Sequence, residues 1–156
     1  MLIGVISDTH GLLRPEAVDA LRGSDQIIHA GDVGAPEILD RLRDIAPLTA
    51  VRGNVDRGGW AREKLRDREV LEIAGVSIYL LHDLGQLDLK PQAAGFAVVV
   101  SGHSHVPIQE MRDGVLYFNP GSAGPRRFKL PVSIGKLIVE GGVVRGELLQ
   151  LRVSES

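Results

Sequence analysis

The sequence contains no cysteine, few aromatic residues and no long apolar run. Each of these features excludes some kinds of structure or function. Without cysteine there can be no disulfide, no thiol nucleophile and no thiolate metal ligand. Aromatic residues make up only 4% of the chain, so we expect an aliphatic core. No run reaches the ~18 apolar residues of a transmembrane helix, and the first residues lack the basic start of a signal peptide. We therefore expect a soluble, cytoplasmic protein without a membrane partner.

The chain also lacks an excess of positive charge. It has 18 Lys and Arg residues against 20 Asp and Glu residues, which gives a formal net charge of -2. A general nucleic-acid-binding domain carries a basic excess, so we predict no specific nucleic-acid partner. At 156 residues with 44% hydrophobic residues, the chain is long enough to bury a sizeable core, and we expect one domain over residues 1–156.

The first half of the chain alternates apolar strand patterns with helical patterns. Pro15 and Pro36 each stand where a helix begins, and the spacing of apolar residues after them is helical. Short apolar runs predict strands at 2–6, 26–30 and 48–51. The polar segment 58–68 is predicted to be part loop and part helix. Alternation of this kind is typical of parallel strand pairing.

The second half consists mainly of predicted strands, with a loop and a short helix in 84–95. The strands are predicted at 69–73, 76–81, 96–100, 108–111, 115–118, 132–139 and 143–151. Asp113-Gly114 and Gly141-Gly142 are typical of tight hairpin turns, which indicates antiparallel pairing in this half.

Polar clusters follow five of the predicted strands. The clusters are Asp8-Thr9-His10, Gly31-Asp32, Gly53-Asn54, His82 and Gly102-His103-Ser104-His105. The chain has five histidines, and four of them stand in these clusters. Ligands bind at the carboxyl ends of strands in α/β sheets. If these strands share one rim, imidazoles, two carboxylates and an amide oxygen converge there.

The pair His103 and His105 follows a buried strand directly. Taken alone, two imidazoles at i and i+2 fit a metal site and a structural role equally well. The other clusters favour metal, because imidazole with carboxylate suits Mn, Fe, Zn, Co or Ni better than Mg or Ca. The candidate ligands exceed what one ion needs and fit two ions that share a carboxylate; they are Asp8, His10, Asp32, Asn54, His82, His103 and His105.

The order Asp-x-His, Gly-Asp, Gly-Asn-x-Asp, His and Gly-His-x-His resembles that of the calcineurin-like metallophosphoesterase superfamily. Together with Asp8-Thr9-His10-Gly11, the motifs His29-Ala30-Gly31-Asp32 and Asn119-Pro120-Gly121-Ser122 are similar to its small single-domain phosphodiesterase branch. The resemblance runs from Ile3 to about Leu137. It implies an α/β fold, a four-layer αββα sandwich of two mixed β-sheets flanked by helices, and a single metallophosphoesterase domain.

The resemblance also implies a role for each candidate ligand. One ion would be held by Asp8, His10, Asp32 and His105. The other would be held by Asp32, Asn54, His82 and His103, so that Asp32 bridges the two. We expect two divalent ions, manganese first, with Ni, Fe, Zn or Co as alternatives.

The implied activity is hydrolysis of a small soluble phosphodiester by a hydroxide that bridges both ions. Two alternatives stay open. One is a phosphomonoesterase or nucleotide hydrolase of the same family. The other is a non-catalytic scaffold like the retromer subunit that resembles this family.

The chain departs from many relatives at two positions near the candidate ligands. Val55 stands where the protein phosphatases have a histidine that protonates the leaving group, and we interpret Val55 as a packing residue. Asp83 stands where the family usually has glycine. Its side chain is predicted either to orient His82 or to face solvent.

Other nearby residues are predicted to support the site. His29 is interpreted as structural, Asp56 as ordering the loop of Asn54, and Asn119 and Ser122 as a turn beside the site.

Basic residues gather in two places. The first group is Arg52, Arg57, Arg62, Lys64, Arg66 and Arg68, and the second is Arg126, Arg127 and Lys129. They would either steer a phosphate substrate or form a solvated face, and we favour the solvated face. Trp60 would stack on a substrate ring, cap the surface, or form a contact in a homo-oligomer.

Overall fold

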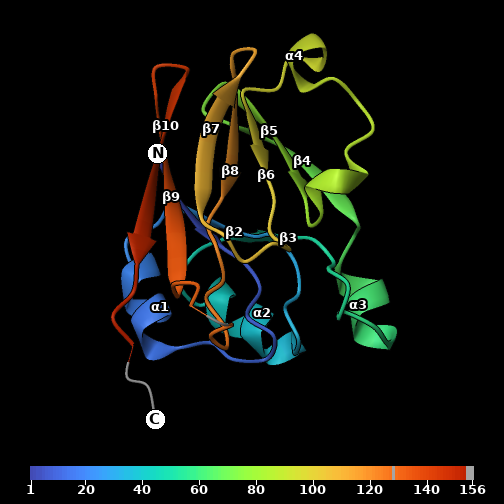
Figure 1. Cartoon of the computed structure of the whole chain (residues 1–156), viewed down its shortest axis with the longest axis vertical. Helices are drawn as coiled ribbons and strands as arrows, with labels where there is room; N and C mark the ends of the chain where they lie inside the picture. The colour runs from blue at the N-terminus through green and yellow to red at the C-terminus, as the bar shows by residue number, and fades with distance from the viewer. Residues whose placement is uncertain (128, 154–156) are drawn as a thin grey trace.

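The computed structural model describes residues 1–127 and 129–153, and its strands form two five-stranded mixed sheets (Figure 1). The first sheet has the order β10-β9-β1-β2-β3. Its strands are β1 (Leu2–Ile6), β2 (Gln26–His29), β3 (Leu48–Ala50), β9 (Ser133–Glu140) and β10 (Val143–Gln150). The second sheet has the order β4-β5-β6-β8-β7. Its strands are β4 (Arg68–Ile73), β5 (Val76–Leu81), β6 (Val98–Val100), β7 (Ile108–Arg112) and β8 (Val115–Asn119).

The helices are short. They are α1 (Pro15–Leu21), α2 (Pro36–Arg43), α3 (Gly59–Lys64), the 3-10 turn η1 (Leu84–Gln86) and α4 (Pro91–Ala94). Proline is the first residue of α1, α2 and α4, where its missing N–H would have had no partner in the helix. Within the described ranges, no helix has the length and apolar character needed to cross a bilayer.

Three apolar clusters hold the layers together. The inner faces of the two sheets pack on each other through residues such as Val5, Ile28, Ile78 and Phe118. The outer face of the first sheet packs on α1 and α2. The outer face of the second sheet is covered by the segment from Leu84 to Phe96, which is only partly helical. The predicted α/β sandwich of two mixed sheets is therefore confirmed, with a thin fourth layer.

Strand pairing differs from the sequence prediction in the second half. The strands β1, β2 and β3 are parallel as predicted. The hairpins β7–β8 and β9–β10 are antiparallel as predicted. However, β6 is parallel to both of its neighbours, β5 and β8. The segment between β5 and β6 crosses the outer face of the sheet, and the hairpin through Asp113 places β7 at the edge, so that β8 lies beside β6.

The clusters predicted to share one rim come from both sheets. Asp8, Asp32 and Asn54 follow β1, β2 and β3 of the first sheet, whereas His82 follows β5 and His103 follows β6 of the second. The two sheets meet at these strand ends, where His82 Nε2 lies 4.0 Å from Asp8 Oδ1. The packing of one sheet on the other thus brings the candidate ligands together.

Candidate metal centre

Asp8 lies at the centre of the site and is completely buried. Its Oδ2 accepts hydrogen bonds from Ser7 Oγ at 2.7 Å and from the backbone N–H of His103 at 3.1 Å. Its Oδ1 has no hydrogen-bond partner among the described residues. That oxygen lies 3.4 Å from His105 Nε2 and 3.7 Å from His10 Nε2. One oxygen is therefore held by the protein, and the other is presented to the two imidazoles.

The two carboxylate oxygens of Asp32 also have different partners. Its Oδ1 accepts a hydrogen bond from the backbone N–H of Val55 at 2.9 Å. Its Oδ2 lies 3.5 Å from His10 Nε2 and 3.2 Å from His82 Nε2. This single oxygen therefore stands between an imidazole predicted for one ion and an imidazole predicted for the other.

The tautomer of His82 is defined by a backbone contact. Its Nδ1 lies 2.7 Å from the carbonyl oxygen of Ala30, which can only accept a hydrogen bond, so Nδ1 carries the proton. The lone pair of Nε2 then faces Asp32. A backbone carbonyl that orients a ring in this way is the usual arrangement behind a metal-binding histidine.

Two groups of side chains have the spacing of metal ligands. They are Asp8 with His10 and His105, and Asp8 with Asp32 and His82; the ligand atoms in each group lie within 4.8 Å of one another. Two atoms bonded to one ion at about 2.1 Å lie about 3.0 to 3.5 Å apart in tetrahedral or octahedral geometry. Several pairs above already have that separation.

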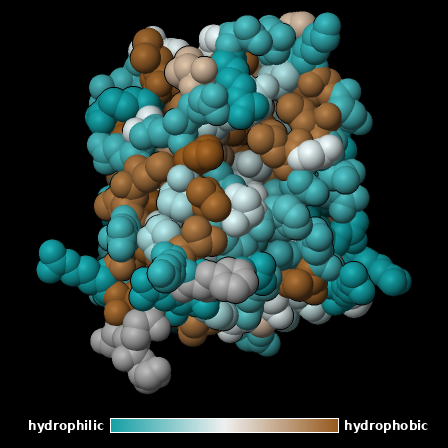
Figure 2. Space-filling view, viewed as in Figure 1, coloured by the Kyte–Doolittle hydropathy of each residue, from teal (hydrophilic) through white to brown (hydrophobic). Residues whose placement is uncertain are grey.

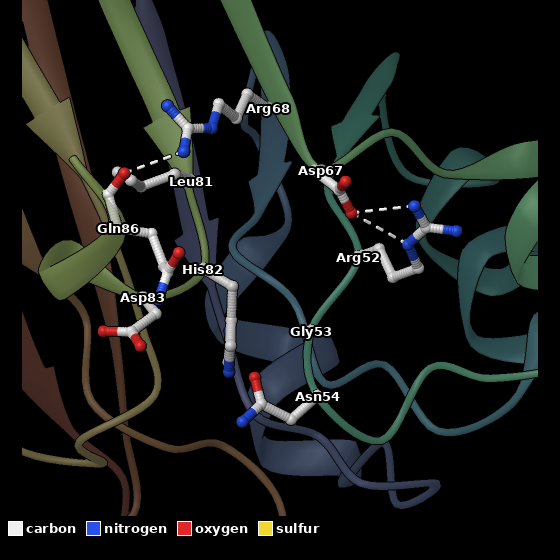
Figure 3. Close-up of a pocket in the computed structure, with 9 residues that line it drawn as sticks. All are labelled: Arg52, Gly53, Asn54, Asp67, Arg68, Leu81, His82, Asp83 and Gln86. Atoms are coloured by element: carbon white, nitrogen blue, oxygen red, sulfur yellow. Dashed lines mark hydrogen bonds and ion pairs between the residues drawn. The ribbon is translucent and has the colours of Figure 1, made fainter. Parts of the chain in front are cut away.

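The remaining two candidates, Asn54 and His103, lie at the open side of the site and are exposed. The ring of His103 has its centroid 5.2 Å from that of His82. The side chains of Asn54 and His82 point toward one another in a pocket of about 270 Å³ (Figure 3). Because Asn54 and His103 are both exposed, the half of the site around His82 is the more open one.

Several buried polar atoms of the site have no hydrogen-bond partner and suit the ligation of a cation. Among the described residues, the buried side-chain atoms without a hydrogen bond are Asp8 Oδ1, His10 Nε2, His82 Nε2 and His105 Nδ1. A buried polar group without a partner costs free energy, so native proteins rarely leave several together. The donor set of carboxylate and imidazole, aimed inward, fits divalent transition-metal ions.

The backbone around the site is strained in a way that accompanies function. Asp8, His10, Asp32, His103 and His105 all have positive φ, between 47° and 73°. Among the other described non-glycine residues, only Ala74 and Asp113 do, and both lie in hairpin turns. Positive φ is unfavourable for residues with a side chain and is retained where surrounding contacts enforce it. Here it turns the side chains that follow the strands into the centre.

Close backbone approach explains two of the glycines. A Cβ on Gly102 would lie 2.1 Å from Ser7 Oγ and 2.8 Å from Asp8 Oδ2. A Cβ on Gly53 would lie 2.2 Å from Asp32 Oδ1. Only glycine lets these loops pass so close to the two carboxylates.

The electrostatics of the site favour a bound cation. Burial by itself would raise the pKa of Asp8, but the neighbouring His10, His105 and Ser7 hold that pKa far below its usual range. Burial opposes ionisation of Asp32 as well, yet His82 and the Val55 N–H keep its pKa below normal. The carboxylate of Asp8 raises the pKa of His10. Burial lowers the pKa of His82, but Asp32 outweighs it and the net pKa is raised. The anionic carboxylates thus attract positive charge.

His29 is not free to bind a metal ion, because both ring nitrogens have protein partners. Its Nδ1 accepts a hydrogen bond from the N–H of Gly31 at 3.1 Å, so the proton is on Nε2. Nε2 donates to Thr9 Oγ1 at 3.0 Å, and that hydroxyl donates to the carbonyl of Val33 at 2.8 Å. Complete burial lowers the pKa of His29 to about 4, so the ring is neutral. It joins the loops that carry Asp8 and Asp32.

Asp56 joins the loops after β2 and β3. Its carboxylate accepts hydrogen bonds from the N–H groups of Val33, Gly34 and Gly53 at 2.9 to 3.1 Å. This agrees with the prediction that Asp56 orders the loop of Asn54.

Asn119, the last residue of β8, and Ser122, which follows it, support the site. Asn119 Nδ2 donates to the carbonyl of Gly102 at 2.9 Å and to Ser104 Oγ at 3.2 Å. Ser122 Oγ donates to the carbonyl of Asp8 at 3.0 Å. Both side chains therefore hold the backbone beside the candidate ligands.

Two sequence predictions near the site are wrong or incomplete. Val55 is not a packing residue: it is 47% exposed, and its backbone N–H donates to Asp32 Oδ1. Asp83 neither orients His82 nor is free in solvent. It accepts a hydrogen bond from the N–H of Gly85 at 2.9 Å and caps η1. In Figure 3 its side chain points away from the ring of His82.

The structure adds information on two residues that the sequence left open or missed. Trp60 is half-buried and packs against the cluster beneath α1 and α2, so it has a core role. Ser7, which holds Asp8 Oδ2, was not predicted. A serine before an aspartate is common, and only the three-dimensional contact distinguishes this one.

Comparison with known proteins gives a consistent match. The model of the calcineurin-like phosphoesterase superfamily domain matches residues 1–142. A probable metallophosphoesterase of Methanocaldococcus jannaschii is 44% identical over 154 residues, which cover 90% of this chain and 77% of that protein.

Solved structures share the fold. The structure of a novel archaeal phosphodiesterase is 26% identical with a TM-score of 0.78, and the match covers 96% of this chain and 100% of that one. Vps29 of Entamoeba histolytica, as a single mutant, is 23% identical with a TM-score of 0.74, over 97% and 100% of the two chains. The likeness to Vps29 is one of fold alone.

Proposed function

Because the chain belongs to the calcineurin-like phosphoesterase superfamily, whose members are metal-dependent phosphoric ester hydrolases, we propose that it is a two-metal phosphodiesterase acting on a small soluble phosphodiester. The observation that carries the proposal is the position of Asp32 Oδ2 between His10 and His82. A carboxylate oxygen within 3.5 Å of two different imidazoles suits a ligand shared by two ions.

The proposed ligand sets follow from these contacts. Asp8, His10, Asp32 and His105 would hold the first ion. Asp32, Asn54, His82 and His103 would hold the second. The first set is mostly buried and the second is open to solvent through Asn54 and His103. Substrate would therefore enter on the side of the second ion. We also propose that residues 1–156 form one metallophosphoesterase domain.

Two divalent ions, when bound, supply a nucleophile from water at neutral pH and neutralise the charge of a phosphodiester. The residues of the chain orient the ligands of these ions. Ser7, the His103 N–H and the Val55 N–H keep the outer oxygens of the two carboxylates occupied, so that the inner oxygens stay aimed at the ions. The Ala30 carbonyl holds His82 in the ligating tautomer. Such preorganisation lowers the cost of binding charge in the transition state.

Val55 defines the kind of ester that suits the site. Its exposed side chain carries no proton to give to a leaving oxygen. Catalysis without a general acid favours alcohols of low pKa, so aryl esters should react faster than alkyl esters.

The proposal is tested with bis(p-nitrophenyl) phosphate and protein freed of metal by a chelator. We expect no turnover until Mn²⁺ is added, and at least a hundredfold lower rate for Asp32→Asn, as removal of a metal ligand implies. Asp19→Asn, which changes a carboxylate that is 76% exposed on α1, serves as the control and should keep full activity. Full turnover by the metal-free protein would refute the proposal.

The same assay separates the alternatives. A phosphomonoesterase or nucleotide hydrolase would turn over p-nitrophenyl phosphate or a nucleotide faster than the diester. A scaffold would turn over neither. The scaffold hypothesis predicted a large apolar patch on the helical layer. In the described residues, none of the large exposed hydrophobic side chains lies on a helix. The face in Figure 2 shows small hydrophobic groups among hydrophilic ones.

A further inference from the structure

A second pocket adjoins the candidate metal centre on the side of Asn54. It is a hollow of about 340 Å³ whose walls include Asn54, Asp56, Arg57 and Arg62. Arg52, Gly53 and Asn54 line both this hollow and the pocket that contains His82, so the two hollows share this segment as a wall. A molecule bound at the second ion would therefore have the arginine-lined hollow next to it.

Among the described residues, Arg57 and Arg62 of this hollow form no ion pair. Arg57 Nε donates to the carbonyl of Asn54 at 3.1 Å, which is a neutral acceptor. In the described part of the chain, neither Arg57 nor Arg62 has a carboxylate within ion-pair distance. The carboxylate of Asp56 lines the hollow but already accepts hydrogen bonds from three backbone N–H groups.

Arg52, the third arginine that lines this hollow, differs from Arg57 and Arg62 because it pairs with a carboxylate. Arg52 donates through Nε and Nη2 to Asp67 Oδ1, at 2.9 and 2.8 Å (Figure 3). Its charge is therefore balanced on the far side of the loop. Among the described residues of this wall, Arg57 and Arg62 are the arginines without a carboxylate partner, and the Nε of Arg57 is already used by Asn54.

We propose that this hollow is a subsite for a second phosphoryl group, so that the substrate is a phosphodiester carrying a further phosphate. The inference rests on the proposed function for the position of the reacting diester. Guanidinium groups bind phosphate through paired N–H donors and do so more strongly than they bind neutral groups. The sequence favoured a solvated face for these arginines, and the pocket next to Asn54 is the reason to prefer a binding role for two of them.

The test uses a matched pair of ligands that differ by one phosphate. Binding of thymidine 3′,5′-bisphosphate and thymidine 5′-monophosphate to Mn²⁺-loaded protein is measured by calorimetry. We expect the bisphosphate to bind about tenfold more tightly, a ratio that one or two charge-assisted contacts supply. In Arg62→Gln and in the double variant Arg57→Gln/Arg62→Gln, the ratio should fall to about twofold or less.

Arg66→Gln is the matched control, since Arg66 is exposed in the same basic segment but lies outside this pocket. It should keep the wild-type ratio. Because Arg57 contacts the backbone of Asn54, the single variant Arg62→Gln decides the matter if the double variant fails to fold. Equal binding of the two ligands by the wild type, or a preference that survives Arg62→Gln, would overturn the inference.

Turnover distinguishes this inference from the proposed function. The p-nitrophenyl ester of thymidine 5′-phosphate is compared with the same ester bearing a 3′-phosphate, and the second should show about tenfold higher kcat/KM. If neither ester is hydrolysed, the proposed function fails, and the binding ratio still decides whether the phosphate subsite exists. If both are hydrolysed equally, the proposed function stands and the subsite is refuted.

Discussion

At the scale of single residues, the two oxygens of Asp8 have different tasks. Oδ2 is held by Ser7 and the His103 N–H, and Oδ1 is left to face two imidazoles. A carboxylate that is oriented by neighbours in this way binds a metal ion without first having to be ordered. The serine is thus as much a part of the proposed metal centre as the histidines.

Replacing Ser7 by alanine should weaken metal binding. The change removes the 2.7 Å hydrogen bond to Asp8 Oδ2 without touching the inner oxygen. Loss of such an outer contact typically costs about 10- to 100-fold in metal affinity. Titration of chelator-treated Ser7→Ala with Mn²⁺ measures it, and Ser77→Ala, which removes an exposed hydrogen bond to Glu72, is the control. An unchanged dissociation constant in Ser7→Ala would contradict this role.

A methyl group on Gly102 should destabilise the fold. The added Cβ would meet Ser7 Oγ and Asp8 Oδ2, both of which are buried and unable to withdraw. Overpacking of this kind costs about 1 to 3 kcal/mol. Gly59→Ala is the matched control, because nothing lies within 4 Å of its added Cβ at the start of α3. Urea unfolding of both variants gives the comparison, and equal midpoints would show that the close approach is unimportant.

At the scale of elements, the loops that follow the strands are joined to one another by buried side chains. Asp56 connects the loops after β2 and β3, and His29 connects those after β1 and β2. The candidate ligands stand on these loops, so the connections determine where the ligands lie.

Removing the Asp56 carboxylate should therefore lower the free energy of unfolding. Asp56→Ala leaves three backbone N–H groups without an acceptor, which costs about 2 to 4 kcal/mol of unfolding free energy. Asp67→Ala breaks an ion pair whose carboxylate is 73% exposed and should cost less than about 1 kcal/mol. Chemical denaturation measures the two costs. A loss for Asp56→Ala no larger than for Asp67→Ala would contradict the role of this carboxylate.

The buried ring of His29 should make the fold sensitive to acid. Its pKa falls from 6.5 to about 4 on burial, so the unfolded chain binds the proton more readily. The contribution to stability is full above about pH 6.5 and is lost as the pH falls from there toward 4, a change on the order of 3 kcal/mol. Unfolding free energies of wild type and His29→Gln, measured with a chelator from pH 7 to 4, should converge at low pH. Parallel curves would refute this.

Most individual elements could be predicted from the sequence, but some pairings could not. Proline at the start of α1 and α2, apolar alternation and the hairpin glycines have local causes, and they predict bounds close to those observed. The parallel position of β6 between β5 and β8 depends on a crossover over the sheet, which no local pattern contains. The contact of the Val55 N–H with Asp32 also joins two separate loops, and no local pattern around Val55 predicts it.

At the scale of the whole molecule, the proposed metal centre lies between the two sheets, and each sheet supplies some of its ligands. The candidate ligands could be chosen from the sequence because they follow strands and share a donor chemistry. Their division between two sheets, and the residues that orient them, such as Ser7, could not. Those features arise from contacts between segments far apart in the chain, such as that between Asp8 and His103.

Metal binding should accordingly stabilise the entire fold. The candidate ligands come from both sheets and converge only in the folded state. An ion that binds the folded state and not the unfolded state stabilises the fold by about 2.7 kcal/mol at a free concentration of 100 times its dissociation constant. For a chain of this size, that raises Tm by roughly 5 to 10 °C. Calorimetric scans with and without Mn²⁺ measure the shift. Asp8→Asn should lose most of it, and an equal shift in Asp8→Asn would place the ions elsewhere.

The most direct test counts metal ions against activity. Chelator-treated protein is reconstituted stepwise with Mn²⁺, and bound metal per chain and hydrolysis of bis(p-nitrophenyl) phosphate are measured on the same samples. The proposed two-ion centre predicts that activity rises mainly as the second ion binds and reaches its plateau at two per chain. Full activity at one ion per chain, or in the metal-free protein, would contradict it.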